Sequence, residues 1–533
     1  MNFNPKESLV IYYKKPIYSA IRYKVVYKML KHHLFYKHSR LIMFMIWLLF
    51  IPHVTVSASS LVVNSSQTST QRTTLAQHDG TRRIDKIQNF VRNKSSGQDT
   101  YYPTLIGADK LHEEGITGAG VTVAVLDTGY WGQKALNQNT NGQNRVLGQY
   151  DAITDSFNPW AAYNTTDESG HGAHITSIIA SSKQGSDDKY NGVAPDVNLL
   201  IVKAFDANGS GSYEDVIRGI NWIIENKDTY NVRVLNLSFS APPQSYYWED
   251  PINQAVMRAW QAGIVVVAAA GNTGPDSMTI GVPGNVPYII TVGAMSDNYT
   301  PEDGSDDILA SFSAAGPTVE QFVKPDLVAP GGHILGYMDS YMTIAQEHPE
   351  YHDNKVYFTM SGTSQATAVM SGVAALMLQE NPSLTPDDVK CRLMSSAQPA
   401  QNENGGLAYS IFQQGAGLVN AYNAVYSTAS GCANQGLDIA NDLNGTQHYQ
   451  GLATQDENGN YHIPNTDGYV WSGADLSSDG YVWSGGYVWS GGYVWSGGYV
   501  WSGGYVWSGN FDWDETPAWS ATSASINQWV PQE

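Results

Sequence analysis

The sequence predicts an α/β protein with a doubly wound, mainly parallel sheet that is flanked by helices. Five short apolar runs, rich in valine and isoleucine and without polar alternation, occur over 121–127, 198–205, 232–239, 264–271 and 288–295. Helix-like segments lie between or after them, over 213–228, 251–263, 364–380 and 386–397. Strands without alternation are buried on both faces, and interleaved helices are typical of parallel crossovers.

The first part of the chain, residues 1–58, is predicted to be a signal or leader segment. An apolar run over 41–51 follows a basic stretch and precedes the small residues Val56 to Ala58, which is the pattern of a secretory signal. The run is too short for the ~20 residues of a membrane-spanning helix, so we expect no spanning helix beyond the leader. An uncleaved anchor is the alternative, and a start at Met29 would give a leader of ordinary length.

The next two regions differ sharply in composition. Residues 59–100 are rich in serine, threonine and glutamine, with one candidate helix over 83–91, and are predicted to be a linker or short pro-segment. Residues 101–432 carry all the strand and helix patterns and are predicted to form the α/β domain.

The C-terminal region is predicted to be a separate unit, made of a polar linker (433–467), hexapeptide repeats (468–509) and a tail (510–533). The hexapeptide GYVWSG begins at Gly468, Gly480, Gly486, Gly492, Gly498 and Gly504. Six is an even number, so an extended chain would present the Tyr and Trp rings on one face. Such a ribbon could attach the protein to a cell surface or polysaccharide; a low-complexity tail without a fixed structure is the alternative.

Charge and cysteine content narrow the function classes. Residues 1–58 hold nine basic residues and one acidic residue, so the rest of the chain has a formal charge of −28. A surface this acidic excludes nucleic acid as an expected partner. Cys391 and Cys432 are the only cysteines. In an exported chain they can form a disulfide, and two free structural cysteines are the alternative.

Four polar residues stand where strands end or helices begin, which is where active residues gather in open parallel sheets. Asp127 ends an apolar run, Asn272 follows another, and His171 and Ser364 open helix-like segments. A serine hydroxyl needs a base, which His171 would provide, and Asp127 would orient the imidazole. Asn272 and the backbone N–H of Ser364 would stabilise the oxyanion.

Other interpretations of these residues are weaker. The sequence Asp-Thr-Gly at Asp127 also marks aspartic peptidases, but no second Asp-Thr-Gly or Asp-Ser-Gly occurs. His171 and His174 have a spacing that could hold a metal, but no Glu-x-x-His pattern supports this, so we expect no metal and a buried structural role for His174. A Gly-Thr-Ser sequence can also be an ordinary helix cap.

The ordered motifs AVLDTG, HGAH, AAAGN and SGTSQAT resemble those of the subtilisin-like serine peptidases, the subtilases. The resemblance covers about residues 101 to 430 and extends to GSGSYEDVIRGINW, NLSFS, GVP and SFSAAGPTVEQFVKPDLVAPG. It implies the subtilase fold and endopeptidase activity for residues 101–432. It also implies a catalytic triad of Asp127, His171 and Ser364, with Asn272 in the oxyanion hole.

The resemblance further implies a substrate-binding set that pairs with the substrate backbone as an added strand. Its members are Gly209, Ser210, Gly211, Ser238, Phe239, Ser240 and Gly281. Gly281 would leave the primary pocket open for large apolar side chains, and Phe239 would narrow the pocket wall. Two features depart from the family: Gln365 replaces the usual Met next to the nucleophile, and Ser-Phe-Ser replaces the usual Ser-Leu-Gly edge.

These observations favour an exported serine endopeptidase, secreted or associated with the cell surface, whose partners are protein or peptide substrates. We expect no cofactor for the chemistry, and structural calcium is implied only by the resemblance, without a located site. The alternative is a surface-binding protein whose repeat tail is the functional part, with the peptidase domain inactive or used for processing. A different acyl hydrolase would show a Gly-x-Ser-x-Gly elbow and another residue order.

Overall fold

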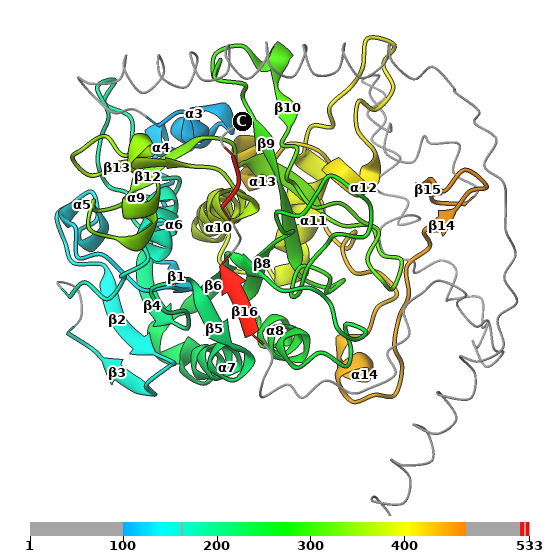
Figure 1. Ribbon diagram of the computed structural model, residues 1–533, viewed down its shortest axis with the longest axis horizontal. Helices are drawn as coiled ribbons and strands as arrows, with labels where there is room; N and C mark the ends of the chain where they lie inside the picture. Colours follow the sequence, from blue (N-terminus) through cyan, green and yellow to red (C-terminus); the bar gives the residue numbers. More distant parts are fainter. Residues whose placement is uncertain (1–99, 161–163, 465–522, 527–528, 532–533) are drawn as a thin grey trace, which may run out of the picture. The chain divides into compact units, whose positions relative to one another are not determined.

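A computed structural model describes residues 100–160, 164–464, 523–526 and 529–531 of the 533-residue chain (Figure 1). The predicted leader, the candidate helix over 83–91 and the repeats over 468–509 lie outside these residues. Within the described ranges, no helix combines the length and the apolar character needed to cross a membrane.

A large central sheet confirms the predicted fold class. In spatial order its strands are β10 (Ile308–Leu309), β9 (Ile290–Ser296), β8 (Val265–Ala269), β6 (Val232–Leu237), β1 (Thr122–Asp127), β4 (Asn198–Lys203), β2 (Val146–Asp151) and β3 (Ser156–Asn158), and β11 (Leu327–Pro330) also pairs with β9. Pairing is parallel throughout except for β10 and β3, which are antiparallel to their neighbours. Buried strands such as β1 and β8 carry apolar residues on both faces.

Helices cover both faces of this sheet (Figure 1). The four principal helices are α6 (His171–Ala180), α7 (Tyr213–Tyr230), α8 (Pro251–Gln261) and α10 (Thr363–Glu380). Leu126 of β1 packs against Gly219 of α7, where a Cβ would come within 2.9 Å of the leucine. Asn236 of β6 pairs with the residue before Leu126 and accepts a hydrogen bond from Ser371 of α10 (2.9 Å). Because successive strand residues face opposite sides, α7 and α10 cover opposite faces.

Residues 433–464, expected to be a polar linker, form part of the same packed unit. They include α14 (Ile439–Leu443) and a hairpin of β14 (Thr454–Gln455) and β15 (Tyr461–His462). Tyr449 and Ile463 are buried in the main core. Asp442 accepts hydrogen bonds from the hydroxyls of Tyr247 (2.5 Å) and Tyr288 (3.0 Å). Scattered apolar and hydrogen-bonding residues, rather than a periodic pattern, anchor this segment.

The remaining elements complete the domain around the sheet. They are α3 (Tyr102–Leu105), α4 (Ala108–Glu113), α5 (Lys134–Asn137), α9 (Thr343–Glu347), α11 (Pro386–Ser396), α12 (Ile411–Gln414), α13 (Ala421–Tyr426), the 3₁₀ helices η3 (Gly304–Asp306) and η4 (Pro349–Tyr351), and the hairpin of β12 (Ile334–Tyr337) and β13 (Tyr357–Met360). Cys391 of α11 forms a disulfide with Cys432, with a Cα–Cα distance of 5.2 Å. The two cysteines are therefore paired.

A small second sheet joins distant parts of the chain. It consists of β5 (Ser210–Ser212), β16 (Ser523–Ile526) and β7 (Phe239–Ser240), with β16 in the middle and antiparallel to both neighbours. Figure 1 shows β16 as the red arrow between the green elements of the domain. The sequence predicted no strand in the tail over 510–533.

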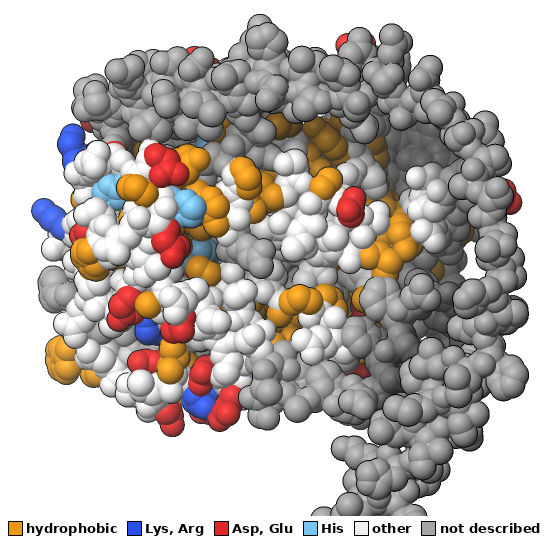
Figure 2. Space-filling model, viewed as in Figure 1, with side chains coloured by type: hydrophobic (Ala, Val, Ile, Leu, Met, Phe, Trp, Pro, Cys, Tyr) orange, Lys and Arg blue, Asp and Glu red, His pale blue; other side chains and the backbone are white. Residues whose placement is uncertain are grey.

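The surface reflects the acidic composition of the chain, which has a formal net charge of −20. Figure 2 shows acidic side chains dispersed over the described part of one face, with few lysine and arginine side chains among them. An acidic, dispersed charge of this kind opposes self-association.

Candidate active site

Asp127 and His171 lie side by side at the carboxyl end of the central sheet. Asp127 is the last residue of β1, and His171 is the first residue of α6. Nδ1 of His171 lies 2.7 Å from Oδ1 of Asp127, and both side chains are buried. A carboxylate at Nδ1 holds a proton on that nitrogen and leaves Nε2 as the acceptor. Nε2 of His171 is buried and accepts no hydrogen bond from a residue that the structure describes.

A second buried carboxylate, Asp167, fixes the start of α6. It accepts hydrogen bonds from the backbone N–H groups of Gly170 (2.9 Å) and Ala173 (2.7 Å) and from the hydroxyl of Thr128 (2.8 Å). The Thr128 hydroxyl accepts in turn from the N–H of Gly172 (2.8 Å). Burial raises the pKa of Asp167, and these hydrogen bonds act in the opposite direction. The sequence did not predict Asp167 or Thr128, because Asp167 lies three residues before the N-cap, Gly170, and outside the usual capping position.

His174 is fully buried one turn after His171, and its predicted structural role is confirmed. Its Nε2 lies 3.1 Å from the carbonyl oxygen of Phe358, and its Nδ1 lies 3.5 Å from Nε2 of Gln365. Burial lowers the pKa of His174 to about 3, so the imidazole is neutral at physiological pH. A neutral ring in this place packs α6 against β13 and α10.

Ser364 is the second residue of α10 and is buried beside β7. Its hydroxyl donates to the carbonyl oxygen of Ser238 (2.9 Å), and the Ser238 hydroxyl donates to the carbonyl oxygen of Ser364 (3.0 Å). The first N–H groups of a helix have no partner within the helix, and the helix dipole is positive at this end. The backbone around Ser364 is therefore suited to stabilise a negative charge.

The structure also brings Asn272 to the start of α10. Oδ1 of Asn272 accepts hydrogen bonds from the N–H (2.9 Å) and the hydroxyl (2.8 Å) of Thr363. Nδ2 lies at the other end of the amide and would be 3.1 Å from a Cβ placed on Gly362. Anchoring one end of the amide directs the donor end toward the residues that precede Ser364.

The predicted substrate-binding residues lie on two short strands and an adjoining loop. Gly209 to Gly211 lead into and form most of β5, and Ser238 to Ser240 lead into and form β7. A Cβ on Gly281 would lie 2.9 Å from Cβ of Ser240, so a side chain there would collide with β7. Phe239 is fully buried, with its ring 5.1 Å from that of Phe205, so it packs into the interior below the strand.

In the part of the chain that the structure describes, no group of three or more His, Cys, Asp or Glu side chains is arranged to hold a metal ion. Calcium binding, which the sequence resemblance implied, stays a prediction without a site.

The sheet, the hydroxyl, the imidazole and the buried carboxylate together are typical of the serine hydrolases. Comparisons with known proteins narrow this class. A family model described as the subtilase family matches residues 118–417. Serine protease AprX of Bacillus subtilis is 41% identical over 315 residues, which cover 58% of this chain and 67% of that protein. Subtilisin DY of Bacillus licheniformis is 32% identical over 318 residues, which cover 59% of this chain and 94% of that protein.

A solved structure is also similar to this chain. It is the crystal structure of fervidolysin from Fervidobacterium pennivorans, a keratinolytic enzyme related to subtilisin, with 26% identity and a TM-score of 0.48. The match covers 63% of this chain and 46% of that one.

The chain belongs to the subtilase family, as the match to residues 118–417 shows. It is a serine-type endopeptidase of the subtilisin kind. The family resemblance that the motifs predicted is thereby confirmed.

Proposed function

We propose that this chain is an exported serine endopeptidase that cleaves peptide bonds through an acyl-enzyme, with Ser364 as nucleophile. The observation that carries the proposal is the contact of 2.7 Å between Nδ1 of His171 and Oδ1 of Asp127, whose side chains are both buried. Ser364 lies in the first turn of α10.

In the first step, His171 would act as the general base. The Ser364 hydroxyl turns from the Ser238 carbonyl toward Nε2 of His171 and attacks the carbonyl carbon of the scissile bond as its proton moves to Nε2. Asp127 keeps the other ring proton on Nδ1 and stabilises the imidazolium that forms. The proton on Nε2 then passes to the leaving amine, and water repeats the sequence to release the acyl group.

The oxyanion that forms during each attack would be held by two donors. One is the backbone N–H of Ser364, at the positive end of α10, and the other is Nδ2 of Asn272. Because Thr363 fixes Oδ1 of Asn272 through two hydrogen bonds, the amide needs little reorganisation when the charge develops.

Substrates would bind in extended form between β5 and β7. Main-chain hydrogen bonds to the edges at Gly209–Gly211 and Ser238–Ser240 provide affinity with little dependence on side chains. We expect Gly281 to keep the primary pocket open for large side chains; the close approach of this loop to Ser240 also requires glycine at this position.

Export and surface attachment form the second part of the proposal. The signal pattern over 1–58 supports a secreted or cell-surface location, and the disulfide between Cys391 and Cys432 fits an oxidising compartment. The repeats over 468–509 would attach the enzyme to a cell surface or polysaccharide; deleting them should release it without changing hydrolysis of a short peptide.

Covalent labelling tests the catalytic proposal directly. We expect a serine-directed fluorophosphonate to label the purified chain at Ser364 and to abolish casein hydrolysis in proportion to labelling. Ser364→Ala is the matched control and should take no label. Labelling at another serine, or casein hydrolysis that survives full labelling, would refute the assignment.

A further inference from the structure

The substrate-binding surface between β5 and β7 is filled by the C-terminal part of this same chain. Ser523, Ala524 and Ser525 of β16 pair with β5, and Ser525 and Ile526 pair with β7. The N–H of Ile526 donates to the carbonyl oxygen of Gly209 (2.9 Å). The two strand edges that we propose for substrate backbone thus have their pairing positions occupied.

The strand β16 runs toward the proposed nucleophile. Ile526 lies opposite Phe239, and Ser525 lies opposite Ser240. Because the two strands are antiparallel, the C-terminal end of β16 lies at the Ser238 end of β7. The Ser238 carbonyl accepts the hydroxyl of Ser364, so this end of β16 approaches the site of attack.

Two side chains on the same face of β16, those of Ala524 and Ile526, contact the rest of the domain. Ala524 is buried, with an exposed fraction of 1%, and belongs to the main core. Ile526 lies against Gly209, where a Cβ would collide with the isoleucine side chain. Gly209 has φ of +71°, so both its conformation and this close approach require glycine.

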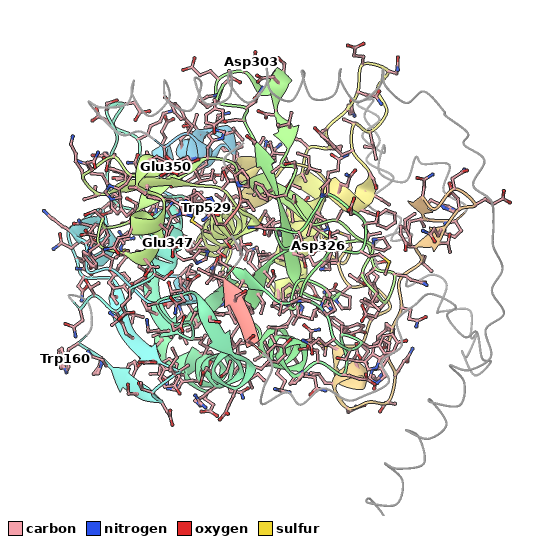
Figure 3. The ribbon with its side chains drawn as sticks, viewed as in Figure 1. Trp160, Asp303, Asp326, Glu347, Glu350 and Trp529 are labelled. Atoms are coloured by element: carbon pink, nitrogen blue, oxygen red, sulfur yellow. A yellow bond between two sulfur atoms is a disulfide. The ribbon has the colours of Figure 1, made fainter. Side chains whose placement is uncertain are left out.

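A second anchor lies beyond the strand. The ring of Trp529 stacks on His348 with centroids 3.8 Å apart and lies 5.4 Å from the ring of Tyr351. Figure 3 shows Trp529 close to the labelled Glu347 and Glu350, which lie on either side of His348 in the sequence. Val530 is buried, with an exposed fraction of 5%. The C-terminal part of the chain is therefore held at two places, at β16 and at Trp529 and Val530.

We propose that residues 523–526 and 529–531, here called the C-terminal segment, occupy the surface between β5 and β7 in the intact chain. The segment acts as an intramolecular inhibitor that competes with peptide substrates. This inference rests on the proposed endopeptidase function of the same surface.

Tethering explains how so short a segment can inhibit. Strand addition gives main-chain hydrogen bonds, and Trp529 adds an aromatic anchor. A tethered peptide meets its site at an effective concentration on the order of 1 mM. A segment with a dissociation constant of about 0.1 mM would then raise the apparent KM about tenfold while leaving kcat unchanged.

Two point variants of the full chain test the inhibition. Ala524→Glu places a charge on the buried face of β16 and should release the segment. Ser523→Glu places the same charge one residue away on the exposed face, and it is the matched control. For a short soluble peptide we expect Ala524→Glu to lower KM about tenfold at unchanged kcat, and Ser523→Glu to match the wild type. Intact mass is checked first, because a chain that has lost its segment would mask the effect.

A binding measurement that needs no activity separates this proposal from the proposed function. A fluorescein-labelled peptide of residues 519–533 should bind the full-length Ser364→Ala/Ala524→Glu protein and bind Ser364→Ala at least tenfold more weakly. Equal binding to both proteins, or no binding to the double variant, would overturn the inference. If Ala524→Glu does not fold, Trp529→Ala takes its place, with a smaller expected gain of about threefold in binding. Binding as expected without any peptidase activity would refute the proposed function alone.

Discussion

The starts of α6 and α10 present His171 and Ser364 by different means. At α6, two buried carboxylates surround the helix start: Asp127 contacts the imidazole, and Asp167 accepts two backbone N–H groups of the first turn. At α10, the contacts are neutral. Asn272 accepts from Thr363, and Ser364 exchanges hydrogen bonds with Ser238.

This difference matches the charge that each helix start would have to stabilise. As the proposed base, His171 would become positive during the reaction, so negative groups around it would assist. The proposed oxyanion near Ser364 would be negative, so a carboxylate there would be unfavourable, whereas an amide and helix N–H groups would be favourable. Substitutions at the start of α6 and at the start of α10 should therefore have different effects on activity and stability.

The largest effect is expected at Ser364, the proposed nucleophile. Ser364→Ala should leave the fold intact and reduce kcat by about 10⁶, which is the scale of the loss in the corresponding serine variant of subtilisin. Steady-state hydrolysis of a chromogenic peptide measures kcat, and circular dichroism checks the fold. Near-normal turnover by the folded variant would exclude Ser364 as nucleophile.

The next largest effect is expected at Asn272, among the uncharged groups at the start of α10. Asn272→Ala should lower kcat by about 10² to 10³, because one oxyanion donor of two is lost. Since Asn272 also binds Thr363, thermal unfolding must be measured beside kcat. A full loss of folding, or an unchanged kcat, would show that Asn272 has only a structural role.

At the start of α6, Asp167→Ala should mainly lower the free energy of unfolding. Removing the carboxylate leaves two buried N–H groups without their acceptor, so we expect a loss of about 3 kcal/mol in the free energy of unfolding. Asp388→Ala is the control, because Asp388 caps the partly exposed start of α11 and should cost only about 1 kcal/mol. Urea unfolding in the Ser364→Ala background compares the two; equal losses would contradict the special role of Asp167.

A smaller, pH-dependent effect is expected from His174, which lies between the two helices. Its pKa is lowered to about 3 in the folded protein and rises to about 6.5 on unfolding, so the unfolded state binds the proton. Its stabilisation is therefore present above pH 6.5 and is lost as pH falls toward 3. Between pH 7 and pH 5 we expect a loss of about 2 kcal/mol relative to His174→Gln, measured by urea unfolding. Parallel pH profiles would contradict this.

The smallest effect concerns oxidation beside the nucleophile. Gln365 cannot form a sulfoxide, so peroxide should inactivate the wild type slowly and Gln365→Met faster. Leu376→Met, in the same helix but farther from Ser364, should behave like the wild type. Residual activity is followed during peroxide treatment. Equal rates for all three proteins would show that position 365 does not control sensitivity.

The sequence predicted the sheet, its main helices and the closeness of Asp127 and His171, because those features follow from apolar runs and strand ends. It did not predict Asp167, which lies in a polar stretch where no periodicity points to a helix cap. Nor did it predict β16. Ser-Ala-Ser-Ile has a weak strand preference alone, and its strand depends on pairing with β5 and β7, far away in the sequence.

The outer strands of the large sheet have a consequence for handling the protein at high concentration. Among the described residues, three strands pair on one side only: β3 (Ser156–Asn158) and β10 (Ile308–Leu309) are very short and antiparallel to their neighbours, and β11 is bridged at Val328 to Leu418. Short or covered outer strands are poor templates for another molecule, which limits edge-to-edge strand pairing and fibre growth. In concentrated solution, we therefore expect intact protein to be lost by self-digestion sooner than by precipitation.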